Sequence, residues 1–292
     1  MMTAAINNTM NHSENTHHHD LKVRQMSFDI DRDIPEFWYD NDPFKTLLLS
    51  ALSGGFPAGE HFFIHSVRHF QDKITDPELK KAVRAFIGQE AHHGKEHQAF
   101  NDFMAKKDLP IASIEAFVKQ GIAFEEKNLS KARMLAKTCA LEHFTAMFAE
   151  MILENPQFLD GIDDRLKPLW LWHAIEESEH KAVAFDVYQK TVDNYWIRSS
   201  EMAVTTVMFS FFTGLHTVEL MRASGEQRNI KAIAQGLNKL LGKKGFFRGM
   251  LPHYLAYYRP DFHPNDRDST QLRNKGLALL KSYLGDKIAL AA

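Results

Sequence analysis

The 292-residue sequence has little of several things that would narrow its class, beginning with cysteine. Its one cysteine, Cys139, cannot form an internal disulfide, which excludes a disulfide scaffold and fits a reducing cytoplasm. We therefore expect Cys139 to be a small residue of the core. The net charge of −2 gives no whole-chain argument for nucleic-acid binding, so we expect no nucleic-acid partner.

The opening of the chain lacks an apolar run of the signal-peptide type. Residues 1–22 are polar and include His17, His18 and His19, and this composition predicts a disordered tail. Because no later linker is polar or long enough to split the chain, residues 23–292 are expected to form one domain. The predicted location is the cytoplasm, with attachment to a membrane surface left open.

Alternating strand patterns are also missing, whereas helical periodicity runs through nearly the whole chain. A first helical segment opens at Asp42-Pro43, and we expect the run Gly54-Gly55-Phe56-Pro57 to break or kink it. The pattern predicts helical stretches over about 58–71, 79–106, 113–126, 131–153, 167–193, 227–241 and 268–284.

Residues 202–218 are largely apolar, but a helix that spans a bilayer needs about 20 apolar residues. Hydroxyl side chains and His216 also interrupt this stretch. We therefore expect a buried helix that lines an apolar pocket. The alternative is a weak association of residues 202–218 with a membrane.

Four glutamates fall in two pairs that are symmetric about predicted turns. Glu60 and Glu90 are each 15 residues from Thr75, and the midpoint between Glu142 and Glu177 falls in the next long turn. In a helical hairpin, residues equally far from the turn lie at similar heights on the facing helices. Each hairpin is therefore expected to place two carboxylates level with one another.

Two of these glutamates begin a Glu-x-x-His motif, Glu90 to His93 and Glu177 to His180, which puts an imidazole on the same helix face. Along the chain the order is therefore Glu, Glu-x-x-His, Glu, Glu-x-x-His. This is the order found in carboxylate-bridged di-iron or di-manganese four-helix bundles. Four ionised carboxylates balance two divalent cations, whereas without metal they would repel one another in a core. We therefore predict an all-α fold, a ferritin-like four-helix bundle with a dinuclear metal centre and extra C-terminal helices.

His173 lies one helical turn before Glu177 on the same face and would add a third imidazole. Mixed oxygen and nitrogen ligands suit two iron ions, with manganese or zinc as alternatives. The predicted metal ligands are Glu60, Glu90, His93, Glu142, His173, Glu177 and His180, and the four glutamates among them are also the predicted catalytic residues.

Other polar residues near the motifs are expected to support the ligands. His97 stands two turns beyond its motif glutamate, and Glu176 and Gln89 each directly precede one. We expect these three to contact ligand side chains, since ligand histidines usually donate their second N–H to such a partner, and a direct metal contact of His97 or Glu176 stays the alternative. His92 and His143 point away from the motif directions, and surface or packing roles suit them.

The site pattern resembles the di-iron N-oxygenases that convert arylamines to nitro compounds, over the seven predicted ligand positions only. The wider sequence, roughly residues 23–284, resembles a bacterial family of predicted metal-dependent hydrolases. The second resemblance is carried by the motifs Gly59-Glu60-His61-Phe62-Phe63, Gly88-Gln89-Glu90-Ala91-His92-His93, Ala140-Leu141-Glu142-His143-Phe144-Thr145-Ala146, Trp172-His173-Ala174-Ile175-Glu176-Glu177-Ser178-Glu179-His180-Lys181 and Arg259-Pro260-Asp261-Phe262-His263-Pro264.

The residues and the first resemblance imply a di-iron or di-manganese oxygenase or oxidase that uses O2 to oxidise an apolar or aromatic small molecule. A separate reductase would supply electrons, because the chain has no Gly-rich nucleotide motif and no cysteine cluster. The alternative is a binuclear metal-dependent hydrolase that attacks its substrate with a metal-bridging hydroxide. Metal storage is a third hypothesis, and a homodimer is compatible with a bundle of this kind.

Overall fold

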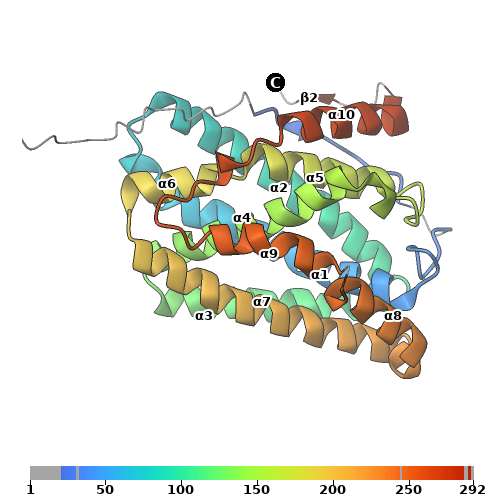
Figure 1. Ribbon diagram of the computed structural model, residues 1–292. Helices are drawn as coiled ribbons and strands as arrows, with labels where there is room; N and C mark the ends of the chain where they lie inside the picture. Colours follow the sequence, from blue (N-terminus) through green and yellow to red (C-terminus); the bar gives the residue numbers. More distant parts are fainter. Residues whose placement is uncertain (1–20, 31–32, 244, 286–288, 291–292) are drawn as a thin grey trace, which may run out of the picture.

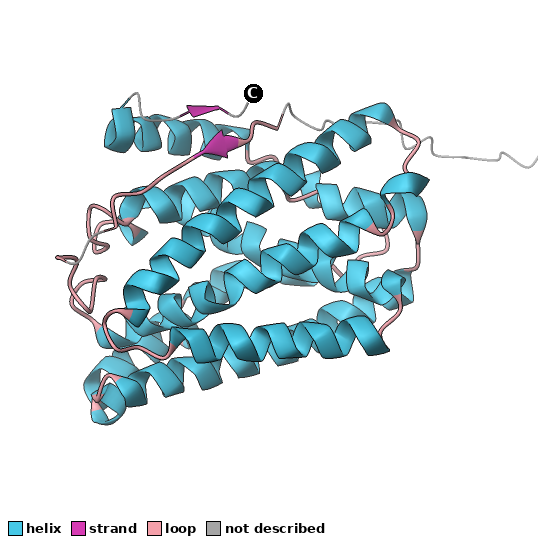
Figure 2. Cartoon of the chain, turned by 180° about the vertical axis from the view of Figure 1, so that it is seen from behind, coloured by secondary structure: helices cyan, strands magenta, loops and turns pink. Residues whose placement is uncertain are grey.

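The computed structural model describes the chain except for residues 1–20, 31–32, 244, 286–288 and 291–292. The predicted tail therefore lies outside the described residues for all but its last two positions, as does the cluster His17 to His19. The described chain is mostly helical, so the prediction of an all-α fold is confirmed. Its only strands within the described ranges are two-residue elements, β1 (Arg24–Gln25) and β2 (Ala289–Leu290), which pair antiparallel (Figure 2).

Four helices surround the centre of the molecule: α1 (Pro43–Arg68), α2 (Pro77–Ala105), α4 (Lys131–Glu154) and α5 (Lys167–His180). Helix α1 packs along α2, and α4 packs along α5 (Figure 1). Three of these helices begin at a short polar side chain that accepts hydrogen bonds from backbone N–H groups of the first turn. These capping residues are Asp42, Asp76 and Ser130. In α1 and α2 a proline follows the cap, at a position where its missing N–H costs no helical bond.

Helix α1 runs without interruption through Pro57, so the predicted break there is wrong. A proline inside a helix leaves the carbonyl four residues earlier without its usual N–H donor. That carbonyl belongs to Ser53, and it accepts a hydrogen bond of 2.9 Å from the Asn101 side chain of α2. A neighbouring helix thus supplies the donor that proline lacks.

The predicted helix over residues 167–193 is divided into α5 and α6 (Val183–Thr191). The division lies at Lys181, whose buried ammonium donates to Glu150, to the Arg267 carbonyl and to Ser269, at 2.7, 2.7 and 3.0 Å. These partners lie far away in sequence, which is why helical periodicity did not reveal the division. The last site histidine, His180, is therefore the final residue of α5.

The remaining helices cover the outside of the four-helix centre. They are α3 (Ile111–Asn128), α7 (Tyr195–Ala223), α8 (Ile230–Leu241), α9 (Phe246–Ala256) and α10 (Thr270–Leu284). Helices α3 and α7 lie along one side and α10 along the opposite side (Figure 1). Helix α9 was not predicted, because it is only 11 residues long and has Pro252 inside it.

Two hydrophobic clusters enclose the centre. One contains Trp38, Phe100 and Trp170, and the other contains Phe62, Phe86 and Phe185. The buried Cys139 belongs to the second cluster, as predicted. Both clusters therefore keep bulk water away from the polar side chains between them.

Helix α7 contradicts the prediction that residues 202–218 are buried. Large apolar side chains along it are open to solvent, among them Val207 at 66% and Phe211 at 63% exposure. By length and composition α7 is long and apolar enough to cross a membrane, with 28% of its most apolar window buried. Periodicity failed here because an apolar helix looks the same in sequence whether or not other elements cover it.

Candidate metal centre

The structure brings all seven predicted ligand residues together at the centre of the four helices. Glu60 comes from α1, Glu90 and His93 from α2, and Glu142 from α4. Helix α5 supplies His173, Glu177 and His180, which point the same way because residues three and four apart share a helix face. All seven residues are between 0% and 6% exposed.

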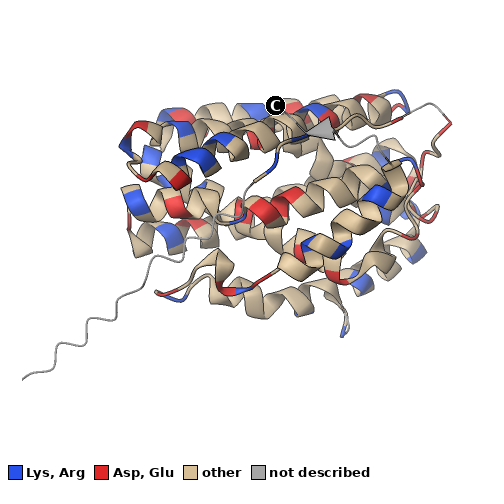
Figure 3. Ribbon diagram, turned by 90° about the horizontal axis from the view of Figure 1, so that it is seen from above, with Lys and Arg blue, Asp and Glu red and all other residues tan. Residues whose placement is uncertain are grey.

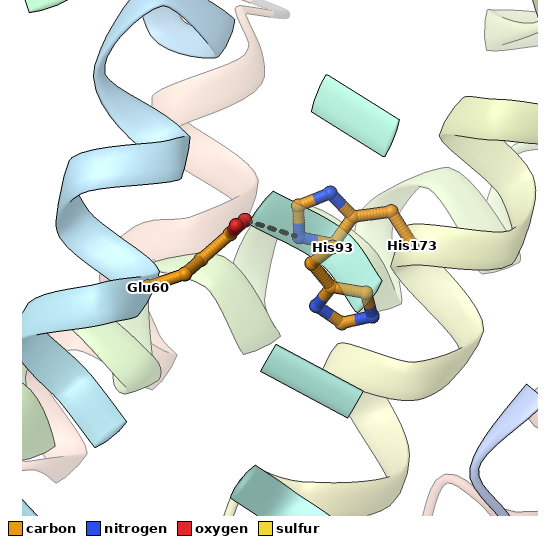
Figure 4. A group of neighbouring side chains, drawn as sticks. All are labelled: Glu60, His93 and His173. Atoms are coloured by element: carbon orange, nitrogen blue, oxygen red, sulfur yellow. Dashed lines mark ion pairs between the residues drawn. The ribbon is translucent and has the colours of Figure 1, made fainter. Parts of the chain in front are cut away.

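One group of ligand atoms joins three helices. Glu60, His93 and His173 each offer an atom within 4.8 Å of the other two. Figure 4 shows the Glu60 carboxylate pointing at the adjacent rings of His93 and His173. A side chain at Gly94 would press on Glu60, since an added Cβ would stand 3.1 Å from the Oε2 atom. This glycine, which the sequence analysis missed, leaves the room that the carboxylate occupies.

A second group lies beside the first and contains Glu90, Glu177 and His180. The Nε2 atom of His180 is 3.0 Å from Glu90 Oε1 and 3.6 Å from Glu177 Oε2. Glu142 joins this group, because its Oε2 atom is 3.4 Å from the same nitrogen. Each of the two groups can hold one metal ion.

Glu177 and Glu90 stand between the two groups. Glu177 Oε1 is 2.9 Å from His173 Nε2 and 3.4 Å from His93 Nδ1, while its Oε2 faces His180. Glu90 Oε1 likewise lies 3.9 Å from His93 Nδ1 in the first group. These two carboxylates therefore have the position that bridging ligands of a metal pair would have.

The three histidines are held by the ring nitrogen that faces away from the centre. His93 Nε2 is 3.1 Å from Glu176, and His180 Nδ1 is 3.0 Å from Gln89. His173 Nδ1 is 2.6 Å from His97 Nε2, and His97 Nδ1 is 2.8 Å from Ser53. A second partner of this kind fixes the ring and leaves the other nitrogen free to bind metal. Glu176, Gln89 and His97 thus occupy the supporting places expected of them.

Arg24 of β1 supports the site from further out and was missed by the sequence analysis. Its guanidinium is buried and lies 3.0 Å from Glu176 Oε1 and 2.7 Å from Glu179 Oε1. These ion pairs hold the carboxylate that contacts His93. No sequence motif could have revealed this, because Arg24 and Glu176 are 152 residues apart.

Burial of the side chains and repulsion between the carboxylates set the protonation of the metal-free site. Burial raises the pKa of Glu60, of Glu90 and of Glu142 above the usual carboxyl value. Burial alone would lower the pKa of His93, but hydrogen bonds to Glu176 and Glu177 raise that pKa to about 10. The carboxylates around His180 likewise raise the pKa of that imidazole well above its usual value. The centre therefore holds several protons at neutral pH.

Metal binding is expected to release these protons. His93 and His180 must lose one each to bind a cation, and a protonated carboxyl must do the same. With at least two protons displaced, apparent affinity should rise about 100-fold per pH unit between about pH 6 and 8. Calorimetric titration in buffers of different protonation enthalpy measures the release. A binding heat that does not depend on the buffer would contradict this prediction.

Two other histidines of the motifs, His92 and His143, lie outside the centre. His143 packs on Tyr257 and Phe262 and is 3.1 Å from the His253 carbonyl, a packing role as expected. His92 lies on α2 and belongs to neither ligand group.

A cavity of about 460 Å³ opens elsewhere, between α1, α4, α8 and α9. It is lined mainly by apolar side chains such as Phe44, Met147 and Phe246, and by none of the seven site residues.

The fold and the site together define an all-α protein with a buried cluster of carboxylates and imidazoles that can hold metal. The chain belongs to the family described as predicted metal-dependent hydrolase, which matches residues 22–268. The resemblance to the predicted metal-dependent hydrolases is thus confirmed. Comparisons with curated proteins and with solved structures found no match. Family membership supports metal dependence, and it favours the hydrolase alternative over the oxygenase that was expected first.

Proposed function

We propose that this protein is an enzyme with a dinuclear metal centre in a ferritin-like four-helix bundle formed by α1, α2, α4 and α5. One observation carries the proposal. Nine oxygen and nitrogen atoms on Glu60, Glu90, His93, Glu142, Glu177 and His180 are buried and make no hydrogen bond of good geometry among the described residues, although several lie 3.0 to 4.0 Å from an opposing atom of the site. Burying so many polar atoms without good hydrogen bonds costs free energy, and two cations would satisfy them.

Each residue has a proposed role that follows from its position. Glu60, His93 and His173 would hold one ion, and Glu142 and His180 the other. Glu90 and Glu177, which lie between the groups, would bridge the ions. The four carboxylates would cancel the charge of two divalent cations.

Hydrolysis is the first reaction that we propose, because family membership supports it. Two bound cations would acidify a water for attack on an ester, amide or phosphate. Burial raises the pKa of Glu60 and of Glu142 in the metal-free site, and bound cations would draw both carboxyls into the ionised form that binds metal.

Oxygen activation at two iron ions is the second candidate, and the third imidazole favours it. His173 brings the set to three nitrogen and four carboxylate ligands, a mixture that suits iron or manganese. Ferrous iron would supply electrons for the reduction of O2. The ring of Phe56 packs against His97 and His173, with centroids 4.8 and 5.2 Å away, so the surroundings suit an apolar or aromatic substrate. This candidate also needs a separate reductase.

Metal analysis and two assays separate the candidates. The purified protein should contain about two metal ions per chain. A hydrolase should cleave test esters or phosphate esters without oxygen, and chelation should abolish the cleavage. An oxygenase should instead carry iron, and its ferrous form should give a transient visible absorption in air. Protein that stays free of metal after reconstitution with iron, manganese or zinc would contradict both candidates.

A further inference from the structure

The outer face of α7 is an exposed apolar surface without charge. From Met202 to Val218 the sequence has no Asp, Glu, Lys or Arg. The exposed large side chains on it are Val204, Val207, Met208, Phe211, Leu215 and Val218, at 45% to 66% exposure. At 100° per residue these positions fall in one stripe along the helix. Such a continuous apolar stripe marks a contact surface rather than ordinary solvent exposure.

Helix α9 extends this surface on one side of α7. Both helices pack on α4, where Phe144 stacks on Phe209 of α7 and on Tyr254 of α9. Thr206 and Tyr254 also share a hydrogen bond of 3.0 Å. The outward residues of α9, Phe247, Leu251 and Leu255, are 43% to 55% exposed and recur every four positions.

Helix α8 adds a third apolar stripe next to α9, with which it is in contact. Ile230, Leu237 and Leu241 are 70%, 44% and 63% exposed and lie on one side of the helix. The order of these helices is visible in Figure 1, where α7, α8 and α9 occupy neighbouring positions on the lower front of the molecule.

The segment that holds α8 and α9 is strongly basic, although the whole chain has a net charge of −2. Residues 222–258 contain seven Lys and Arg residues but one acidic residue, Glu226. Those whose exposure is described are all exposed: Arg222, Arg228, Lys231, Lys239, Lys243 and Arg248. The opposite side of the molecule, seen from above in Figure 3, carries acidic and basic residues side by side.

We propose that the exposed apolar stripes of α7, α8 and α9, with the basic residues of 222–248, form a surface that binds an anionic lipid bilayer. Apolar side chains would enter the interfacial region, and the cations would contact lipid phosphates. A second copy of the chain fits less well, because a symmetric contact through this face would bring two basic clusters together. The inference does not depend on the reaction at the metal centre.

Vesicle co-sedimentation with the full, metal-loaded chain tests the proposal. The protein should partition onto phosphatidylcholine vesicles that contain phosphatidylglycerol, and high salt should weaken the binding. Phe211→Glu should reduce the partition coefficient at least about tenfold. Lys243→Glu with Arg248→Glu should reduce it at least about 20-fold, at about fivefold for each cation lost. Tyr283→Glu on α10 and Lys80→Glu on α2 are the matched controls and should change little.

These variants change exposed side chains, so metal content and thermal stability should remain those of the parent protein. Absence of binding to anionic vesicles would overturn the proposal, and so would equal binding to vesicles of phosphatidylcholine alone. A lipid-free dimer in light scattering that Phe211→Glu converts to monomers would overturn it in favour of a second copy.

Discussion

Replacing Glu177 by alanine is expected to remove both metal ions from the purified protein. The Glu177 carboxylate stands between the two ligand groups, within 3.6 Å of nitrogens on His93, His173 and His180. In the proposed centre, its loss would take a ligand from each ion and one of the four charges that balance them. Metal content should fall from about two ions per chain to below about 0.2, as measured by plasma emission spectrometry.

Glu201→Ala is the matched control for Glu177→Ala. Glu201 is also a buried glutamate, on α7, but it pairs with the half-exposed Arg133 and lies outside both ligand groups. Its substitution should leave the metal content unchanged. His173→Ala should remove mainly the ion held with Glu60 and His93, leaving about one per chain. Full metal content in the Glu177→Ala protein would disprove the proposed site.

Removing the metal is expected to lower the melting temperature by more than about 10 °C. A ligand present at about 1,000 times its dissociation constant stabilises the folded state by about 4 kcal/mol for each site. In a chain of this size each kcal/mol corresponds to about 2–4 °C. Without cations, the carboxyls of Glu60, Glu90 and Glu142 must also take up protons or repel one another, since burial raises the pKa of each.

Differential scanning calorimetry with and without chelator measures this shift. Glu142→Gln sharpens the experiment, because the amide has nearly the same shape but no charge to neutralise. The metal-free variant should melt above the metal-free parent, and metal should stabilise it less. Equal melting temperatures of the parent protein with and without chelator would refute a structural contribution of the metals.

The convergence of the site could be predicted from sequence because it depends on local rules. Helix periodicity puts Glu177 and His180 on one face, and equal distances from a turn put Glu60 level with Glu90. The structure brings these residues together, and it also places Glu176 and Gln89 behind the histidines of the facing helix.

What the sequence could not predict depends on contacts between distant segments. The donor from Asn101 that carries α1 through Pro57, and the acceptors around Lys181 where α5 ends, are long-range partners. The exposure of α7 was missed for a related reason, since hydrophobicity does not say which helices have neighbours on their outer side.

The pairing of β1 with β2 connects residues 289–290 to the candidate metal centre. Arg24 pairs with Leu290 in this ladder, and its guanidinium holds the carboxylate that orients His93. An affinity tag or a deletion that displaces residues 289–290 should therefore also disturb Arg24, and through Glu176 the imidazole of His93. An affinity tag for metal analysis should therefore stand at the other terminus, or be cleaved before the ions are counted.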